Sequence, residues 1–163
     1  MTVSPRFAWP VTSYAISCPL RLVLDTGVLV AALRSRGGAS WQLVDGALAR
    51  RFTLVVSVPL ALEYEAVLIR EEQRNVHGLS VQEVIEVVNA LIRVSEPVQI
   101  RFLWRPLLSD PADDMVLETA VNGRADGLMT FNEADFAPAA RKFAFNILRP
   151  SEALRRVRAH PDE

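Results

Sequence analysis

Short apolar runs alternate along the chain with longer segments whose apolar residues recur at helical spacing. Five compact apolar runs predict buried strands at Arg21–Leu24, Phe52–Ser57, Val98–Leu103, Gly127–Thr130 and Phe143–Leu148. The segments between them predict helices at Val28–Leu33, Ser40–Leu48, Leu60–Arg74, Val81–Val94 and Asp110–Asn122, and Pro150 opens a terminal helix. Residues Asn132–Ala140 predict a loop. Strands that alternate with helices predict an α/β fold with a mostly parallel sheet covered by helices on both faces.

Capping residues mark where several of these helices begin. Ser40 is predicted to cap the second helix, and Ser80 followed by Glu83 predicts a capping box for the fourth. Asp110 stands directly before a proline and predicts the N-cap of the fifth helix, which makes Asp113 an exposed acid of its first turn.

The length and the cysteine count limit the organisation of the chain. A chain of 163 residues fits one domain, which the predicted elements place at residues 21–158. Residues 1–20 predict a loosely ordered extension or a start codon assigned too far upstream, and residues 159–163 a short tail. Because no run of about 18 apolar residues occurs, we expect no membrane-spanning helix. Cys18 is the only cysteine, so a reducing compartment, the cytoplasm, is expected.

The charge balance gives no overall attraction to nucleic acid, because the formal net charge is −1. The basic residues are unusual in kind, since Lys142 is the only lysine among 18 lysines and arginines. Arg binds phosphate through paired hydrogen bonds and stacks on bases, so a local Arg patch could bind RNA. The codon usage of a GC-rich genome produces the same bias.

Acidic residues follow four successive predicted strands. Asp25 comes directly after the first strand, and Glu63 lies one turn into the helix after the second. Asp114 begins the helix after the third strand, and Asp135 lies in the predicted loop after the fourth. Because ligands of open parallel sheets bind beyond the carboxyl ends of the strands, we expect these carboxylates at one edge of the sheet.

Four neighbouring carboxylates repel each other and need either raised pKa values or bound cations. A donor set made of oxygens suits Mg²⁺ or Mn²⁺ rather than zinc, and His77 and His160 lie at a helix end and in the tail. A divalent ion held by carboxylates can activate water and stabilise the leaving oxygen of a phosphodiester. Taken alone, each acid also fits a helix cap or a solvated helix residue.

The acids lie in the segments Val23-Leu-Asp-Thr-Gly-Val-Leu-Val30, Pro59-Leu-Ala-Leu-Glu63, Ser109-Asp-Pro-Ala-Asp-Asp-Met-Val-Leu-Glu118 and Met129-Thr-Phe-Asn-Glu-Ala-Asp-Phe136. In order and spacing these segments resemble the successive motifs of PIN-domain proteins over about residues 21–150. The most similar group is that of the VapC-like toxins of bacterial toxin–antitoxin systems. The resemblance implies a three-layer α/β/α sandwich and a metal-dependent endoribonuclease that hydrolyses single-stranded RNA.

The resemblance also implies a role for individual positions. It assigns Asp25, Glu63, Asp114 and Asp135 as catalytic and metal-binding acids of an Mg²⁺ or Mn²⁺ site, with Thr26, Thr130 and Asn132 as supporting residues. It further implies a homodimer and a small antitoxin protein, one of whose Arg side chains would pair with the acids. The apolar helices predicted at Leu60–Arg74 and Val81–Val94 are candidates for the partner face, with core packing as the alternative use of their apolar residues.

One position departs from the family pattern. The family usually has Asn directly after Asp-Thr, where this chain has Gly27. That Asn would orient Asp25 by hydrogen bonding, so Gly27 indicates reduced activity. The alternative to a nuclease is therefore a PIN-like binding or scaffold protein with weak or no catalysis.

Three other classes of enzyme fit the sequence less well. Asp25-Thr26-Gly27 also occurs in aspartic proteases, but those proteins are all-β and the segment after Gly27 predicts a helix. A haloacid-dehalogenase-like phosphatase needs a second Asp where Gly27 stands. A dinucleotide-binding domain needs Gly-x-Gly-x-x-Gly after its first strand, and this pattern does not occur.

Overall fold

The computed structural model describes residues 19–103 and 108–160. Nearly all of the predicted extension at residues 1–20, and most of the predicted tail at residues 159–163, lie outside the described residues. The division into extension, domain and tail therefore stays a prediction.

A five-stranded parallel sheet forms the centre of the molecule. Its strands are β1 (Arg21–Leu24), β2 (Thr53–Ser57), β3 (Glu96–Val98), β4 (Gly127–Met129) and β5 (Asn146–Leu148), in the spatial order β3-β2-β1-β4-β5. Leu24 pairs with Met129, so β1 and β4 end at the same level at the middle of the sheet. This arrangement confirms the predicted α/β fold with parallel strands.

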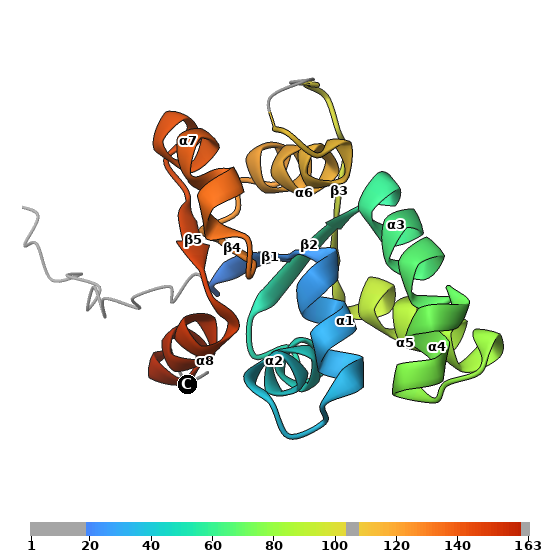
Figure 1. The fold of residues 1–163 in the computed structure, drawn as a ribbon. Helices are drawn as coiled ribbons and strands as arrows, with labels where there is room; N and C mark the ends of the chain where they lie inside the picture. The colour runs from blue at the N-terminus through green and yellow to red at the C-terminus, as the bar shows by residue number, and fades with distance from the viewer. Residues whose placement is uncertain (1–18, 104–107, 161–163) are drawn as a thin grey trace, which may run out of the picture.

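Helices cover both faces of the sheet. They are α1 (Thr26–Arg34), α2 (Ala39–Leu48), α3 (Val58–Leu68), α4 (Glu71–His77), α5 (Val81–Val94), α6 (Pro111–Asn122), α7 (Glu133–Phe143) and α8 (Pro150–Ala159). Figure 1 shows α6 and α7 on one side of the strands, α1, α2 and α8 on the other, and α3 to α5 grouped beyond β2. The layers are those of the predicted α/β/α sandwich. Among the described residues, no helix is long and apolar enough to cross a membrane.

The predicted loop at Asn132–Ala140 is wrong, because α7 occupies most of it. Pro138 lies inside this helix and the segment is polar, so its composition hides the helical spacing. The helix nevertheless buries Phe136 and Ala139 in the core. Burial of this apolar face outweighs the low intrinsic propensity of the segment.

Three other predicted elements differ at their boundaries. The strand predicted at Phe143–Leu148 begins at Asn146, because α7 continues to Phe143 and ends at Ala144 in a left-handed conformation. The helix predicted at Leu60–Arg74 is interrupted after Leu68, because Arg70 takes an extended conformation before α4. The third strand ends at Val98 instead of continuing to Leu103. The backbone N–H groups of Arg101 and Phe102 donate to Oδ1 of Asn122, at 3.0 and 3.1 Å, rather than to a neighbouring strand.

The helix caps are predicted in part. Ser80 and Glu83 form the predicted capping box of α5. The N-cap of α2 is Gly38, whereas the predicted cap Ser40 is buried in the first turn. Ser57 caps α3 and is held by a buried hydrogen bond with the hydroxyl of Thr119, at 2.7 Å. This last contact fixes the end of β2 against α6.

Candidate acidic centre

Asp25 stands where β1 ends and α1 begins, at the carboxyl edge of the sheet. Its N–H donates to the carbonyl of Met129 at 3.0 Å, and its own carbonyl accepts from the N–H of Val28 at 2.9 Å. Burial raises the pKa of its carboxyl group, an effect that a hydrogen bond from Thr130 and the nearby amides of Gly27 and Thr26 oppose. The half-buried carboxylate is thus fixed in position but incompletely compensated for its lost hydration.

A chain of hydrogen bonds joins Asp25 to Asp135. The fully buried Thr130 donates from Oγ1 to Oδ2 of Asp25 at 2.7 Å, and the same Oγ1 accepts from the N–H of Asn132 at 2.9 Å. Asn132 in turn donates from Nδ2 to Oδ2 of Asp135, at 2.7 Å. Asp135, in the first turn of α7, is therefore oriented through Thr130 and Asn132. The family resemblance assigns these two residues a supporting role for the acids.

Thr130→Val keeps the shape of the side chain at this position and removes its hydroxyl group. We expect the pKa of the Asp25 carboxyl group to rise further, because it loses the hydroxyl that donates to its charged form. A folded-state pKa that is raised costs stability as the pH rises, so the free energy of unfolding should fall more between pH 4 and pH 7 in the variant than in the parent. Urea unfolding of both proteins at the two pH values, in EDTA, checks this result. An equal fall in both proteins would contradict it.

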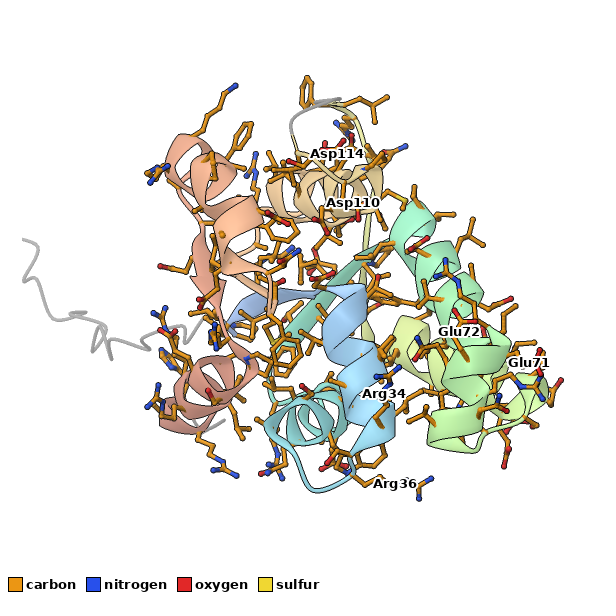
Figure 2. The ribbon with its side chains drawn as sticks, in the orientation of Figure 1. Arg34, Arg36, Glu71, Glu72, Asp110 and Asp114 are labelled. Carbon is orange, nitrogen blue, oxygen red and sulfur yellow. The ribbon has the colours of Figure 1, made fainter. Side chains whose placement is uncertain are left out.

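The start of α6 brings three more acids to the same edge. Asp110 is the N-cap and accepts from the N–H of Ala112 at 2.9 Å, as the sequence predicts. Asp113, predicted to be exposed, is buried, with 8% of its surface accessible. Figure 2 shows Asp110 and Asp114 at α6, away from the labelled charged side chains of α1 and α4.

Asp113 is the most strongly perturbed acid of the group. Burial, and then the charges of Asp25, Asp110, Asp135 and Asp114, raise its pKa to about 6. Its Oδ2 is buried and has no hydrogen-bond partner among the described residues. We call Asp25, Asp110, Asp113, Asp114 and Asp135 the acidic centre. The sequence predicts such repulsion for a different set of acids, which includes Glu63 and lacks Asp110 and Asp113.

Two of the predicted site acids are placed differently from Asp25 and Asp135. Asp114 is buried, and its Oδ1 accepts from the N–H of Leu108 at 3.1 Å. One oxygen of Asp114 is therefore used to fix the backbone at Leu108, which precedes α6. Glu63 is half-buried on α3 and is not among the acids that raise the pKa of Asp113. Thr26 is buried behind Asp25, with its hydroxyl unpaired among the described residues.

One feature of the sequence indicates that Asp113 is buried, although its position at a helix start suggests an exposed residue. Asp113 precedes Leu117 and Ala120 by four and seven residues, so the three share one face of α6. Leu117 and Ala120 are both buried in the core. This spacing would have placed Asp113 on the buried side of the helix.

The donor set fits a hard divalent cation by its chemistry. Carboxylate oxygens that repel each other, one of them buried without a donor, are what Mg²⁺ or Mn²⁺ would stabilise. As the described side chains stand, no three His, Cys, Asp or Glu groups converge closely enough to enclose an ion. Their charges are close enough to raise the pKa of Asp113, but the carboxylates would have to draw together to enclose a cation.

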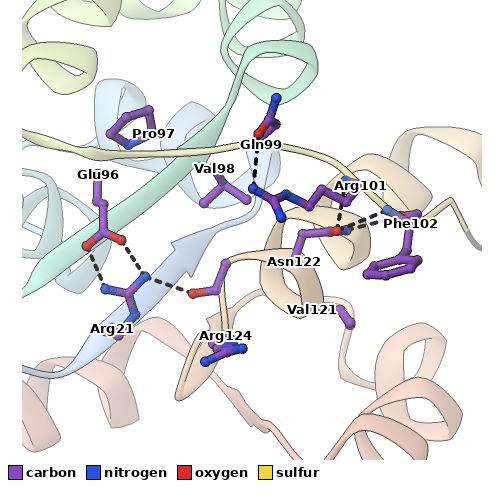
Figure 3. A pocket seen from close by; sticks show the side chains of 11 residues that line it. Arg21, Glu96, Pro97, Val98, Gln99, Arg101, Phe102, Val121, Asn122 and Arg124 are labelled. Atoms are coloured by element: carbon purple, nitrogen blue, oxygen red, sulfur yellow. Dashed lines mark hydrogen bonds and ion pairs between the residues drawn. The ribbon is translucent and has the colours of Figure 1, made fainter.

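A cavity of about 760 Å³ lies apart from these acids, beside the start of β1 and the end of α6. Figure 3 shows Arg21 in its wall, paired with both oxygens of Glu96 at 2.6 and 2.9 Å. The hydrogen bonds from Arg21 lower the pKa of Glu96, and Arg21 also donates to the carbonyl of Gly123 at 2.8 Å. These contacts join β1, β3 and α6, so Arg21 serves to connect elements of the fold.

A family model described as PIN domain matches residues 21–134, which include every residue of the acidic centre except Asp135. A search of the curated proteins found no match.

Proposed function

Because this match spans more than half of the chain, the chain belongs to the PIN-domain family, and we propose that it is a metal-dependent endoribonuclease acting on single-stranded RNA. PIN domains are generally nucleases that use divalent metal ions. The observation that carries the proposal for this chain is the acidic centre, where burial and the charges of Asp25 and Asp135 raise the pKa of Asp113. A scaffold protein has no need to tolerate this repulsion.

We assign Asp25, Asp113 and Asp135 as the acids that would hold Mg²⁺ or Mn²⁺. Asp114 and Glu63 remain predicted members of the same site. The bound ion would polarise the phosphodiester and lower the pKa of the attacking water. The chain itself would orient the donors, since Thr130 fixes Asp25 and Asn132 fixes Asp135.

The test is cleavage of a labelled single-stranded RNA by the purified full-length protein. We expect cleavage with Mg²⁺ or Mn²⁺, none with EDTA, and little on a duplex of the same sequence. Asp25→Asn, prepared in the same way, excludes a contaminating nuclease. A parent protein that leaves RNA intact with either metal would overturn the proposal.

Gly27 favours the alternative function, a binding or scaffold protein with weak catalysis. A Cβ built at Gly27 meets no atom within 4 Å, so a side chain at this position has open space. Gly27→Asn restores the residue usual in the family, which supports the neighbouring acid. We expect a cleavage rate about tenfold or more above that of the parent, with α1 slightly stabilised because Gly is a poor helix residue. Rates and melting temperatures of both proteins check this.

Gly27→Ala provides the matched control, because it gains the helix propensity without the amide group. An equal rise in rate for both variants would show that helix stability, and not orientation of Asp25, limits the parent. If neither variant cleaves RNA although both fold, the binding or scaffold function is favoured.

We further propose that this protein is a toxin of the bacterial cytoplasm. In this proposal a small antitoxin protein neutralises it, and it forms a homodimer. An apolar groove of about 370 Å³ lies between α3, the end of α5 and β3. The side chains of Val58, Leu62 and Ile92 border it and are 71%, 63% and 42% exposed. Co-expression with the product of the adjacent gene, which should suppress toxicity and co-purify, tests the antitoxin. Light scattering of the protein alone tests the dimer.

A further inference from the structure

A further cleft, of about 310 Å³, has none of the acidic centre in its lining, and no role has yet been assigned to it. Its walls are the end of α1 at Ala31 and Ser35, the start of α2 at Gly38–Ser40, the start of α8 at Arg149–Ser151, and Phe131. We call it the α2/α8 cleft. Phe131 stands between Thr130 and Asn132, the two residues that orient Asp25 and Asp135. The segment that orients these acids therefore also forms part of the cleft.

Two helices begin at this cleft without a side-chain cap, although Pro150 at the first position of α8 has no N–H, so the donors of α8 begin at Ser151. The N-caps are Gly38 for α2 and Arg149 for α8, and neither makes a side-chain capping hydrogen bond. The first N–H groups of a helix point out of its N-terminal end and carry partial positive charge. Two such ends at one cleft provide backbone donors for an anion.

Ser40 adds a side-chain donor to the cleft. The residue lines the cleft and is only 6% exposed, and its hydroxyl has no hydrogen-bond partner among the described residues. Because this oxygen is unpaired but not fully buried, it is open to the cleft. A phosphate oxygen in the cleft would accept from this hydroxyl and would complete its hydrogen bonding.

The rim of the cleft adds a cation and an aromatic surface. Arg149 lies at the rim with 61% of its side chain exposed, and Glu133 offsets part of its charge through an ion pair at 3.2 Å. Phe131 is 52% exposed and offers a face on which a base can stack. An anion site beside an exposed aromatic ring matches one nucleotide of a single strand.

We propose that the α2/α8 cleft binds a backbone phosphate of single-stranded RNA next to the scissile bond, with the adjoining base stacked on Phe131. The identity of the ligand as substrate rests on the proposed function, whereas phosphate binding does not. The cleft would offset the repulsion between the acidic centre and the RNA backbone. It would also explain a preference for single strands, because a paired base cannot stack on a side chain.

The test measures binding separately from cleavage. A fluorescein-labelled single-stranded RNA octamer is titrated with the full-length protein in EDTA, and anisotropy is recorded at several salt concentrations. Ser151→Asp adds a carboxylate at the second position of α8, where the helix dipole favours it, so the fold is retained. We expect about tenfold weaker binding and a salt slope smaller by about one, as for one lost phosphate contact. Phe131→Ala should weaken binding by about fivefold or more.

Matched controls are Ser80→Asp, which keeps a helix cap while adding the same charge elsewhere, and Phe102→Ala, which removes another exposed ring. Both controls should bind like the parent. The inference is overturned if the parent does not bind the octamer, or if Ser151→Asp and Phe131→Ala bind no more weakly than their controls. Competition by inorganic phosphate or uridine monophosphate at concentrations as low as that of the octamer would identify a free phosphate ligand and overturn the RNA assignment.

Cleavage of the same RNA with Mn²⁺ separates this inference from the proposed function. A parent that does not cleave, together with weakened binding by both cleft variants, would refute the nuclease and support the cleft. A parent that cleaves, with both variants unaffected in binding and rate, would refute the cleft and support the nuclease.

Discussion

Asp113→Asn is expected to lower the rate of RNA cleavage by at least about 100-fold, more than loss of an orienting residue costs. The reason is that Asp113 places a buried, unpaired carboxylate oxygen among the charges of Asp25 and Asp135. Asp114→Asn should cost less than about tenfold, because the amide oxygen of Asn can still accept the hydrogen bond from Leu108. Single-turnover cleavage rates with saturating Mn²⁺ measure both variants.

The two substitutions form a matched pair, since each removes one negative charge from adjacent positions of α6. Circular dichroism and melting temperature control for folding. A large loss for Asp114→Asn with a small loss for Asp113→Asn would contradict this assignment. It would instead support the prediction from the sequence, in which Asp114 is the acid of this segment.

Asp113→Asn is also expected to stabilise the protein at neutral pH when no metal is present. The pKa of Asp113 is raised from 3.8 to about 6, so the folded protein binds the proton more tightly than the unfolded chain. The parent therefore loses stability as the pH rises from about 4 through about 6, whereas Asn carries no charge to repel. After allowance for solvent screening, we expect the variant to gain on the order of 2 kcal/mol at pH 7 and little at pH 4.

Urea unfolding of parent and variant at both pH values, in EDTA, gives this difference in the free energy of unfolding. Comparing the two proteins cancels the contributions of other carboxyl groups, such as Glu83 and Glu96, whose pKa values are lowered. Equal stabilities at pH 7, or a variant that is less stable there, would show that Asp113 does not carry the repulsion attributed to it.

The sheet and its carboxyl edge were predictable from the sequence because local patterns determine them. The strand before Asp25 is a short apolar run in the sequence and a central strand in the structure, buried from Leu22 to Leu24. The link between Thr130 and Asp25 follows from topology, since β1 and β4 are neighbours whose ends coincide. Adjacent strands in a parallel sheet bring residues together that lie far apart in the chain.

The parts that were not predictable depend on packing. The helix that carries Asp135 contains Pro138, and its polar sequence does not indicate the burial of Phe136 that holds it against the core. Likewise, Asp113 and Asp114 are both buried, and they differ in their tertiary contacts: Asp114 accepts from Leu108, whereas one oxygen of Asp113 has no donor among the described residues. Ser40 resembled a helix cap, and its burial at the α2/α8 cleft depends on how α2 and α8 lie together.

The most direct test of a metal site at the acidic centre is calorimetric titration of the full-length parent and of Asp25→Asn with Mn²⁺. The account predicts saturable binding by the parent that is weakened by at least about tenfold in the variant, which loses a charged ligand in the centre of the group. Competition by Mg²⁺ should reduce the apparent affinity of the parent for Mn²⁺. Absence of Mn²⁺ binding by the folded parent, or equal affinity of the two proteins, would contradict the central claim.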